Sequence, residues 1–489
     1  MKISVPAAPR PLTKSEFMDF RECEKSFWLQ RNKPALAGDR TPGEFDRLLM
    51  QDGYAVEALA GALFAAREDA GRFTMQAEIS CGRCLIRTDF IFRNADGSID
   101  IYEVKSSTSP DEHIADACFQ KLVAHWAGFV VGAVHVVHLN PHYRRCGDID
   151  PTELLIVAEV TDAVAAIAPE IERDIERALL LLDQPAIDEA GCACILKSRA
   201  RHCPSFRHFH PDLPERPVHI LPRMQGARLA NILASGRRSV TELTSADVTP
   251  SQLPVLNAML ADRPLIDIKA LSRFLAGLTF PLHFYDYETA GSAIPSAEGH
   301  GPHEQIPVQF SVHILEEDGQ LRHHEFLADD HGSEEVLINA LQSALGATGT
   351  ALAWNESFEK GCNRRLARLA PSHAEFLADV TERTTDLMAP FRRDYVHPDF
   401  DGSTSIKKVL PVLVPSLSYE GMAVHDGAGA ILAFRKMVAE KPGEARAALR
   451  RQLLAYCRLD TLAMVEIYRH LVDTVLEPGN LKHSRASVS

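Results

Sequence analysis

Two acidic residues on one predicted strand and a tyrosine–aspartate pair on one predicted helix have the types and spacing of a metal site. Asp286 and Glu288 alternate with tyrosines in the run PLHFYDYETA (281–290), so we expect both carboxylates on one face of a strand. Tyr456 and Asp460 are four residues apart in a segment with strong helical periodicity, so they should share a helix face. Because adjacent buried carboxylates repel one another and lose hydration, the pattern predicts a bound cation.

Two more polar residues lie between these elements. Asn355 ends the buried, strand-like run GTALAWNE, and Glu359 lies at the start of the helix that follows. Each residue taken singly has a structural interpretation: Tyr456 as core packing, Asp460 as a surface charge and Glu359 as an acid favoured by the helix dipole. The common order and spacing of these residues favour one joint site.

This arrangement resembles the DEDD exonucleases, which are built on an RNase H-like fold. The resemblance implies that four acids bind two divalent metals, Mg²⁺ or Mn²⁺, and that Tyr456 orients the attacking water. The four acids are Asp286, Glu288, Glu359 and Asp460. Asn355 fits the N-x-x-F-D pattern of that superfamily, which implies a contact with nucleic acid. Glu359 stands where the superfamily usually has aspartate, and its longer side chain can still reach a metal.

The segment GSTSIKKVLP (402–411) contains candidates for contacts with a phosphate backbone, namely Ser405, Lys407 and Lys408. Several basic pairs, including this one, could form a patch, although scattered basic pairs are usually solvated surface. Asp386 is either an additional acid near the site or a helix cap.

A second group of charged residues lies in a predicted β-hairpin. The strand-like runs CLIRTDFIF and IDIYEVKSS flank RNADGS, which contains an Asp-Gly turn signal. A hairpin centred near Asp96 would place Asp89 opposite Glu103, with Lys105 on the same face. Carboxylates can hold Mg²⁺ and a lysine can position water, so the trio fits a metal-dependent phosphodiesterase. The alternative is a solvated polar face of the hairpin.

This trio resembles the PD-(D/E)XK nuclease signature. The resemblance implies that Asp89 and Glu103 bind metal and that Lys105 is catalytic. RecB-like members of the superfamily carry a glutamine on the following helix, and Gln120 matches that position. Glu57, on an upstream helix-like stretch, is the candidate for a further acidic motif.

Four cysteines form a further candidate site: Cys23, Cys192, Cys194 and Cys203. One N-terminal cysteine with a cluster after the nuclease core resembles the iron–sulfur staple of RecB-like exonucleases, which implies a [4Fe–4S] cluster. The spacing is irregular, and His208 and His210 lie where a last cysteine would be expected. Zinc and a metal-free remnant therefore remain alternatives. Cys81 and Cys84 are predicted to be two semi-buried thiols without a metal.

Composition limits the class of protein. The 489 residues are 46% apolar and 24% charged, typical of globular domains, and are too many for one ordinary core. The net charge of −14 argues against a protein that coats nucleic acid through bulk positive charge. The N-terminus lacks a signal-peptide pattern, and the longest apolar stretch (129–139) is about half a membrane span. We therefore expect a cytoplasmic protein with reduced thiols and no membrane association.

The pattern along the chain predicts an α/β protein with mixed sheets, a helical linker (216–278) and a flexible tail (476–489). The resemblances above imply a PD-(D/E)XK, restriction-endonuclease-like domain over 1–215 and an RNase H-like domain over 279–475, and the linker is similar to helix-hairpin-helix-like ones. The segments YDYETAGSAIPSAEGHGPHEQIPVQFSVHI, AWNESFEKGCNRRLA, GSTSIKKVLP and YCRLDTLAMVEIYRHL resemble the bacterial domain of unknown function 2779 family. That resemblance implies a RecB-like nuclease module fused to a YprB-type RNase H-like exonuclease domain.

Together these features predict a metal-dependent nuclease that acts on DNA or RNA, trimming 3′ ends at the C-terminal site and carrying a second PD-(D/E)XK site. The alternative is a nucleic-acid-binding or scaffold component with decayed catalytic sites, acting in repair or antiphage defence.

Overall fold

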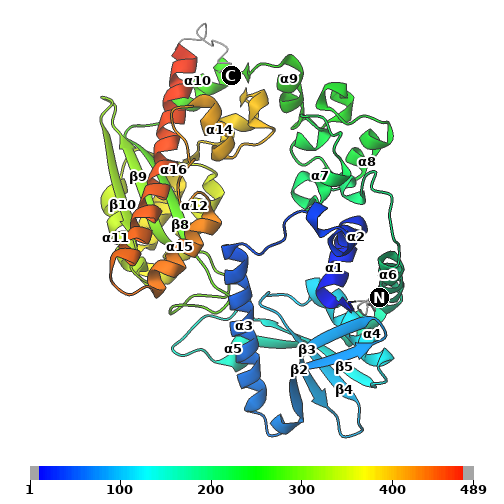
Figure 1. Ribbon diagram of the computed structural model, residues 1–489. Helices are drawn as coiled ribbons and strands as arrows, with labels where there is room; N and C mark the ends of the chain where they lie inside the picture. Colours follow the sequence, from blue (N-terminus) through cyan, green and yellow to red (C-terminus); the bar gives the residue numbers. More distant parts are fainter. Residues whose placement is uncertain (1–9, 477–489) are drawn as a thin grey trace. The chain divides into compact units, whose positions relative to one another are not determined.

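The chain forms two compact units in the computed structural model, which describes residues 10–476. The N-terminal unit extends to Asp212 and includes Ser292–His303, and the C-terminal unit comprises Leu213–Gly291 and the residues from Glu304 onward. The predicted tail lies outside the described residues except for Leu476. Both units combine helices with a mixed sheet, which confirms the predicted α/β class (Figure 1). Among the described helices, none has the length and apolar character needed to cross a membrane.

The N-terminal unit is built on a six-stranded sheet with the order β1-β3-β4-β5-β6, in which β2 also pairs with β3. Its strands are β1 (Leu12–Thr13), β2 (Phe73–Cys81), β3 (Cys84–Arg93), β4 (Ile99–Val104), β5 (Val131–Leu139) and β6 (Leu155–Glu159). Its helices are α1 (Lys14–Glu22), α2 (Glu24–Asn32), α3 (Glu44–Ala65), α4 (Ile114–Trp126), α5 (Pro151–Leu154), α6 (Thr161–Leu182) and α7 (Phe206–Phe209).

Strand alternation determines which helices cover each face of this sheet. Ile101 of β4 joins a core cluster with Phe119 of α4 and Ile171 of α6, whereas its neighbour Tyr102 joins a cluster with Phe64 of α3. The β3–β4 hairpin pairs Phe90 with Tyr102, which confirms the predicted hairpin centre near Asp96.

The C-terminal unit contains a five-stranded sheet with the order β10-β9-β8-β11-β12. Its strands are β8 (Leu282–Ala290), β9 (Ile306–Leu315), β10 (Leu321–Leu327), β11 (Thr350–Ala353) and β12 (Thr384–Asp386). The first three form an antiparallel meander, while β11 runs parallel to both β8 and β12.

Helices cover both faces of this second sheet. Tyr285 and Tyr287 of β8 pack in a cluster with residues of α11 (Glu334–Leu345), α12 (Glu356–Leu369) and α13 (Ala374–Arg383). Phe284 of β8 belongs instead to a cluster with α10, α14 and α16. The helices on this second face are α10 (Ile268–Ala276), α14 (Ile406–Leu413), α15 (Gly427–Ala439) and α16 (Glu444–Leu476). Because Asp286 and Glu288 alternate in step with Phe284, they lie on the side of α16.

The segment ahead of β8 contains the short helices that the sequence predicts. They are α8 (Gly226–Ala234), α9 (Leu253–Ala261) and α10, and a short strand β7 (Leu265–Ile266) pairs with β13 (Tyr395–Val396). This pairing, and a core cluster that includes Val396, tie residues 213–278 to the C-terminal unit.

Candidate metal and nucleic-acid sites

The C-terminal unit brings four predicted acids together. Asp286 and Glu288 come from β8, Glu359 from the first turn of α12 and Asp460 from the middle of α16. Burial has the largest influence on the pKa of Asp286. The negative charges of Asp460, Glu288 and Glu359 come next, in that order. Glu288, Glu359 and Asp460 are buried, and Asp286 is partly exposed. The spacing in the sequence therefore does correspond to one cluster in space.

Burial and mutual repulsion disfavour ionisation of these carboxylates. Burial, with the charge of Asp460 next, raises the pKa of Asp286 and that of Glu288 well above their ordinary values. Burial also raises the pKa of Glu359 to about 8 and that of Asp460 to about 6. Such a cluster is fully ionised at neutral pH only when cations neutralise it.

The donor set fits hard divalent cations. Oε2 of Glu359 is buried and has no hydrogen-bond partner among the described residues, so it is a free ligand atom. Carboxylate oxygens are the ligands that Mg²⁺ and Mn²⁺ prefer. We conclude that the four acids can hold such ions.

Two tyrosines and a lysine surround the acids. Tyr419 donates a hydrogen bond to Oδ1 of Asp460 over 2.5 Å. Nζ of Lys407 donates to the hydroxyl of Tyr456 over 3.1 Å and lies over the rings of Tyr456 and Tyr419. Burial raises the pKa of the Tyr456 phenol, which keeps it protonated. Sequence reasoning missed Tyr419, because no periodic pattern links it to Asp460.

An open cleft of about 850 Å³ leads to these residues. Asp286, Glu288, Tyr456 and Asp460 line it, and so do the predicted nucleic-acid contacts Asn355, Ser405 and Lys407. Lys408 is not among the lining residues, and its Nζ lies 3.1 Å from Oδ2 of Asp401 instead. The structure therefore brings Asn355 and Lys407, but not Lys408, to the cleft.

Asp386 supports the start of α12. Its Oδ1 accepts hydrogen bonds from the backbone N–H groups of Asn355 at 3.1 Å and Met388 at 3.0 Å. Its Oδ2 lies 2.9 Å from the guanidinium of Arg392. These contacts hold Asn355 in the left-handed conformation (φ 73°) from which α12 begins. These contacts agree with the capping interpretation, and the action of the Asp386 charge on Glu359 agrees with an additional acid near the site.

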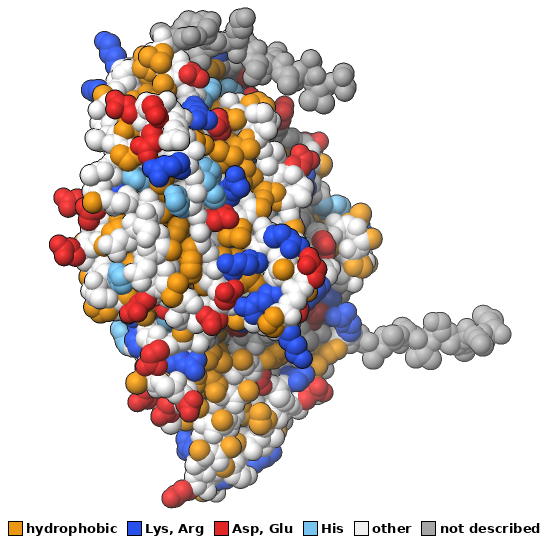
Figure 2. Space-filling view, turned by 90° about the vertical axis from the view of Figure 1, so that its left-hand side faces the viewer, with side chains coloured by type: hydrophobic (Ala, Val, Ile, Leu, Met, Phe, Trp, Pro, Cys, Tyr) orange, Lys and Arg blue, Asp and Glu red, His pale blue; other side chains and the backbone are white. Residues whose placement is uncertain are grey.

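The remaining basic pairs do not form one uninterrupted basic surface. On the face drawn in Figure 2, Lys and Arg side chains are interspersed with Asp and Glu side chains. Arg450 pairs with Asp329 at 3.0 Å and Arg451 with Glu444 at 2.5 Å. Both of these arginines therefore already have a carboxylate partner.

The N-terminal unit gathers the other predicted acids. Glu57, Asp89 and Glu103 line one pocket of about 200 Å³. Oδ2 of Asp89 accepts a 2.7 Å hydrogen bond from the backbone N–H of Val104. Burial, together with the charge of Glu103, raises the pKa of Asp89 to about 7.

Glu103 already has cationic partners in the protein. Nζ of Lys105 lies 2.8 Å from its Oε1, which also contacts Nζ of Lys14. Gln120 donates to its Oε2. Burial opposes ionisation of Glu103, but the two lysines outweigh it and lower its pKa to about 2. Lys105 also lies 2.7 Å from Oδ2 of Asp116.

Sequence reasoning missed Lys14. It follows the first strand in the opening segment LTKSEF, 89 residues before Glu103, and no local pattern links it to that glutamate.

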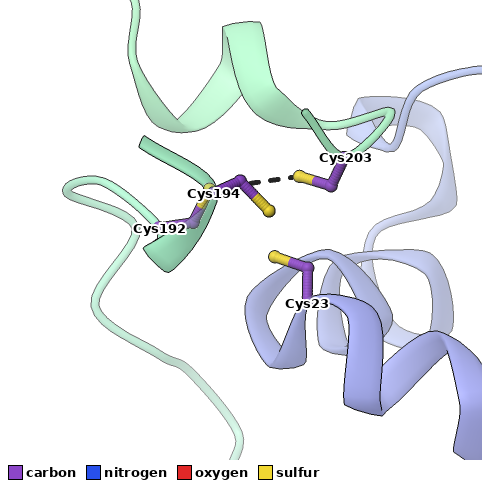
Figure 3. Close-up of side chains that lie close together, drawn as sticks. All are labelled: Cys23, Cys192, Cys194 and Cys203. Carbon is purple, nitrogen blue, oxygen red and sulfur yellow. Dashed lines mark hydrogen bonds between the residues drawn. The ribbon is translucent and has the colours of Figure 1, made fainter. Parts of the chain in front are cut away.

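The four cysteines converge in the N-terminal unit (Figure 3). Cys23 lies between α1 and α2, in extended backbone rather than inside a helix, and the others lie in the segment before α7. All four are buried and unbridged, and their sulfur atoms lie within 4.8 Å of one another. Sγ of Cys192 and Sγ of Cys203 are 4.0 Å apart. This set can hold a metal by itself.

The two histidines considered from the sequence have other positions. Nε2 of His210 accepts a 3.0 Å hydrogen bond from the backbone N–H of Cys192 and lies 3.5 Å from its sulfur. His208 lies 2.7 Å from Glu189. His210 therefore supports the site from outside the set of four thiols. Cys81 and Cys84 face one another across the β2–β3 turn, and neither belongs to a metal-ligand group of the described residues.

Comparison with known proteins agrees with the resemblance in part. Residues 283–405 match the family model described as "Domain of unknown function (DUF2779)". No curated protein matches the chain. One solved structure, described as "Crystal structure of SSO0001", shares 14% identity over 40% of this chain and 90% of that chain, with a TM-score of 0.25. A similarity of that size carries no argument about fold or function.

Proposed function

We propose that the C-terminal unit is an RNase H-like, metal-dependent exonuclease that hydrolyses phosphodiester bonds of DNA or RNA, trimming 3′ ends. The observation that carries the proposal is the group of four clustered acids at an open cleft. Within residues 10–476 one oxygen of Glu359 has no hydrogen-bond partner, and Lys407 offsets part of the charge of Glu288 and Asp460. The mixed sheet and the match over residues 283–405 are consistent with it.

In this mechanism the acids hold two divalent ions, Mg²⁺ or Mn²⁺, which polarise the phosphoryl group and activate water when bound. The phenol of Tyr456 stays protonated, so it can orient a water molecule near Asp460. Tyr419 holds the Asp460 carboxylate in place through its hydrogen bond. Lys407 offsets negative charge at the cleft wall and fixes the Tyr456 hydroxyl.

We further propose that the N-terminal unit is a RecB-like PD-(D/E)XK module. Asp89 and Glu103 are its metal ligands, and Lys105 and Gln120 are its other functional residues. A specific observation also favours a second candidate function for this unit, which is to bind nucleic acid without cutting it. Both oxygens of Glu103 are already engaged by Lys14, Lys105 and Gln120.

Digestion of 3′- and 5′-labelled single-stranded DNA and RNA with Mn²⁺ tests these proposals. We expect Asp286→Ala to lower cleavage by about 1,000-fold, because the metal contribution is worth several kcal/mol. Lys105→Ala reports what the N-terminal site adds, and Glu317→Gln, an exposed turn residue, is the matched control. If metal-replete wild-type protein cleaves none of these substrates, the nuclease proposal fails and the binding function is favoured.

For the cysteine site we propose a single tetrahedral ion, Zn²⁺, rather than a [4Fe–4S] cluster. Zn–S bonds of about 2.3 Å in a tetrahedron place sulfur atoms about 3.8 Å apart. The observed limit of 4.8 Å and the Cys192–Cys203 distance of 4.0 Å agree with this spacing. In an iron–sulfur cube each thiolate binds a different iron, which requires wider separation.

Purification without oxygen, followed by metal analysis and visible absorbance, tests this assignment. We expect colourless protein with one zinc per chain, and loss of that zinc in Cys194→Ser but not in Cys146→Ser. A brown protein with four irons per chain would contradict the zinc assignment.

A further inference from the structure

Arg223 is a cationic cleft residue that the proposed mechanism does not use. It lies in the segment ahead of the catalytic sheet, is exposed, and lines the same cleft as Asp286 and Asp460. No hydrogen bond or ion pair joins its guanidinium to any other residue in the described range 10–476. Of the other two cleft cations, Arg392 is paired with Asp386 and Lys407 with Tyr456.

The backbone at Arg223 is held in an uncommon conformation. Its φ of 54° lies in the left-handed region, which a residue other than glycine seldom adopts. The carbonyl oxygen of Pro222 accepts a 2.7 Å hydrogen bond from the buried Gln252 side chain, and Leu221 and Met224 are buried on either side. The neighbouring residues therefore anchor the loop and leave the arginine side chain exposed.

A glycine lets this loop approach the cleft wall. A Cβ on Gly402 would lie 2.2 Å from the carbonyl oxygen of Ile220. Only glycine at this position therefore allows the two segments of the chain to pack this closely. Gly402 immediately precedes the segment that supplies Ser405 and Lys407 to the cleft. This contact joins the segment that carries Arg223 to the segment that carries the predicted phosphate contacts.

We propose that Arg223 binds a backbone phosphate of the nucleic-acid strand in the C-terminal cleft. Four acids would repel a polyanion, and a guanidinium with all its donors available can bind phosphate through two parallel hydrogen bonds. The inference rests on the proposed function, because it assigns Arg223 to the substrate of that site. It makes the segment 213–278 part of the substrate site and gives Arg223 a role in positioning the strand.

Binding of a fluorescein-labelled single-stranded oligonucleotide, followed by anisotropy with Ca²⁺ in place of Mn²⁺, tests the proposal. We expect Arg223→Ala to weaken binding about tenfold. The slope of log binding constant against log salt concentration should become shallower by roughly 0.7. Arg223→Lys should lie between the two. Arg263→Ala, an exposed arginine of the same segment outside the cleft, should bind like wild type. In cleavage with Mn²⁺, Arg223→Ala should raise KM more than it lowers kcat.

The outcomes separate this inference from the nuclease proposal. If wild type cleaves and Arg223→Ala binds and cleaves equally well, the role of Arg223 is overturned and the nuclease proposal stands. If binding depends on Arg223 but no metal supports cleavage, Arg223 keeps its role and the nuclease proposal fails. If wild type binds no oligonucleotide, both are overturned. An unchanged unfolding temperature for Arg223→Ala shows that any loss is not a folding defect.

Discussion

The two acidic sites bury carboxylates in opposite ways. In the N-terminal unit, Glu103 is neutralised by two lysines of the protein, and its pKa is lowered to about 2. In the C-terminal unit, burial raises the pKa values of all four acids, and mutual repulsion adds to this at Asp286 and Glu288. The charge of Lys407 acts on two of them, Glu288 and Asp460.

This difference separates a site whose charge is balanced by the protein from a site that needs external cations. Breaking a buried pair leaves an uncompensated charge, whereas removing one of several like charges relieves repulsion. Metal binding at the N-terminal site must compete with Lys14 and Lys105. Metal binding at the C-terminal site removes a repulsion that already exists.

The largest expected effect concerns the free energy of unfolding measured in EDTA. Two substitutions of a carboxyl by an amide, one in each site, should change it in opposite directions. Glu103→Gln should lower the free energy of unfolding by about 3 kcal/mol, because Lys14 loses its buried partner. Asp286→Asn should raise it by about 1 kcal/mol, because folding then no longer has to protonate or bury a repelled carboxylate at this position. Thermal unfolding with exposed controls, Glu78→Gln and Glu317→Gln, measures both. Equal signs for the two variants would remove the distinction between the sites.

Addition of Mn²⁺ should stabilise the protein mainly through the C-terminal site. At a concentration one hundred times Kd the expected gain is about 2.7 kcal/mol. Asp286→Asn should abolish most of the shift in unfolding temperature, and Asp89→Asn should leave most of it. A shift that instead depends on Asp89 would place the stronger metal site in the N-terminal unit.

A smaller effect is expected from pH in EDTA. The raised pKa values of Asp460, about 6, and Glu359, about 8, mean that the folded state holds protons that the unfolded state has lost. Stability therefore falls as pH rises from 5 to 8, through the folded-state pKa values of both groups. The pKa of Asp89 is raised to about 7, so this residue adds a smaller fall in stability over the same pH range.

The contribution of Glu103 has the opposite sign and a different range. It is complete above pH 4.5 and is lost as pH falls through about 2. Unfolding temperatures measured across this range should show the fall between pH 5 and 8 disappear when Mn²⁺ is present. A fall that persists with Mn²⁺ would contradict the assignment of these acids as metal ligands.

The sequence by itself determined the features that depend on local periodicity. Asp286 and Glu288 share a strand face, Tyr456 and Asp460 share a helix face, and the β3–β4 hairpin is centred near Asp96. Strand and helix repeats are set by the backbone over a few residues, so spacing alone predicts these placements.

Only the tertiary structure decided which distant residues complete the sites. Lys14 reaches Glu103 across 89 residues, and Tyr419 reaches Asp460 across 41. Arg223 lines the cleft from a segment whose sequence shows no catalytic pattern. Such contacts arise from packing and chain topology, which no local repeat encodes, and they determine how each buried charge is balanced.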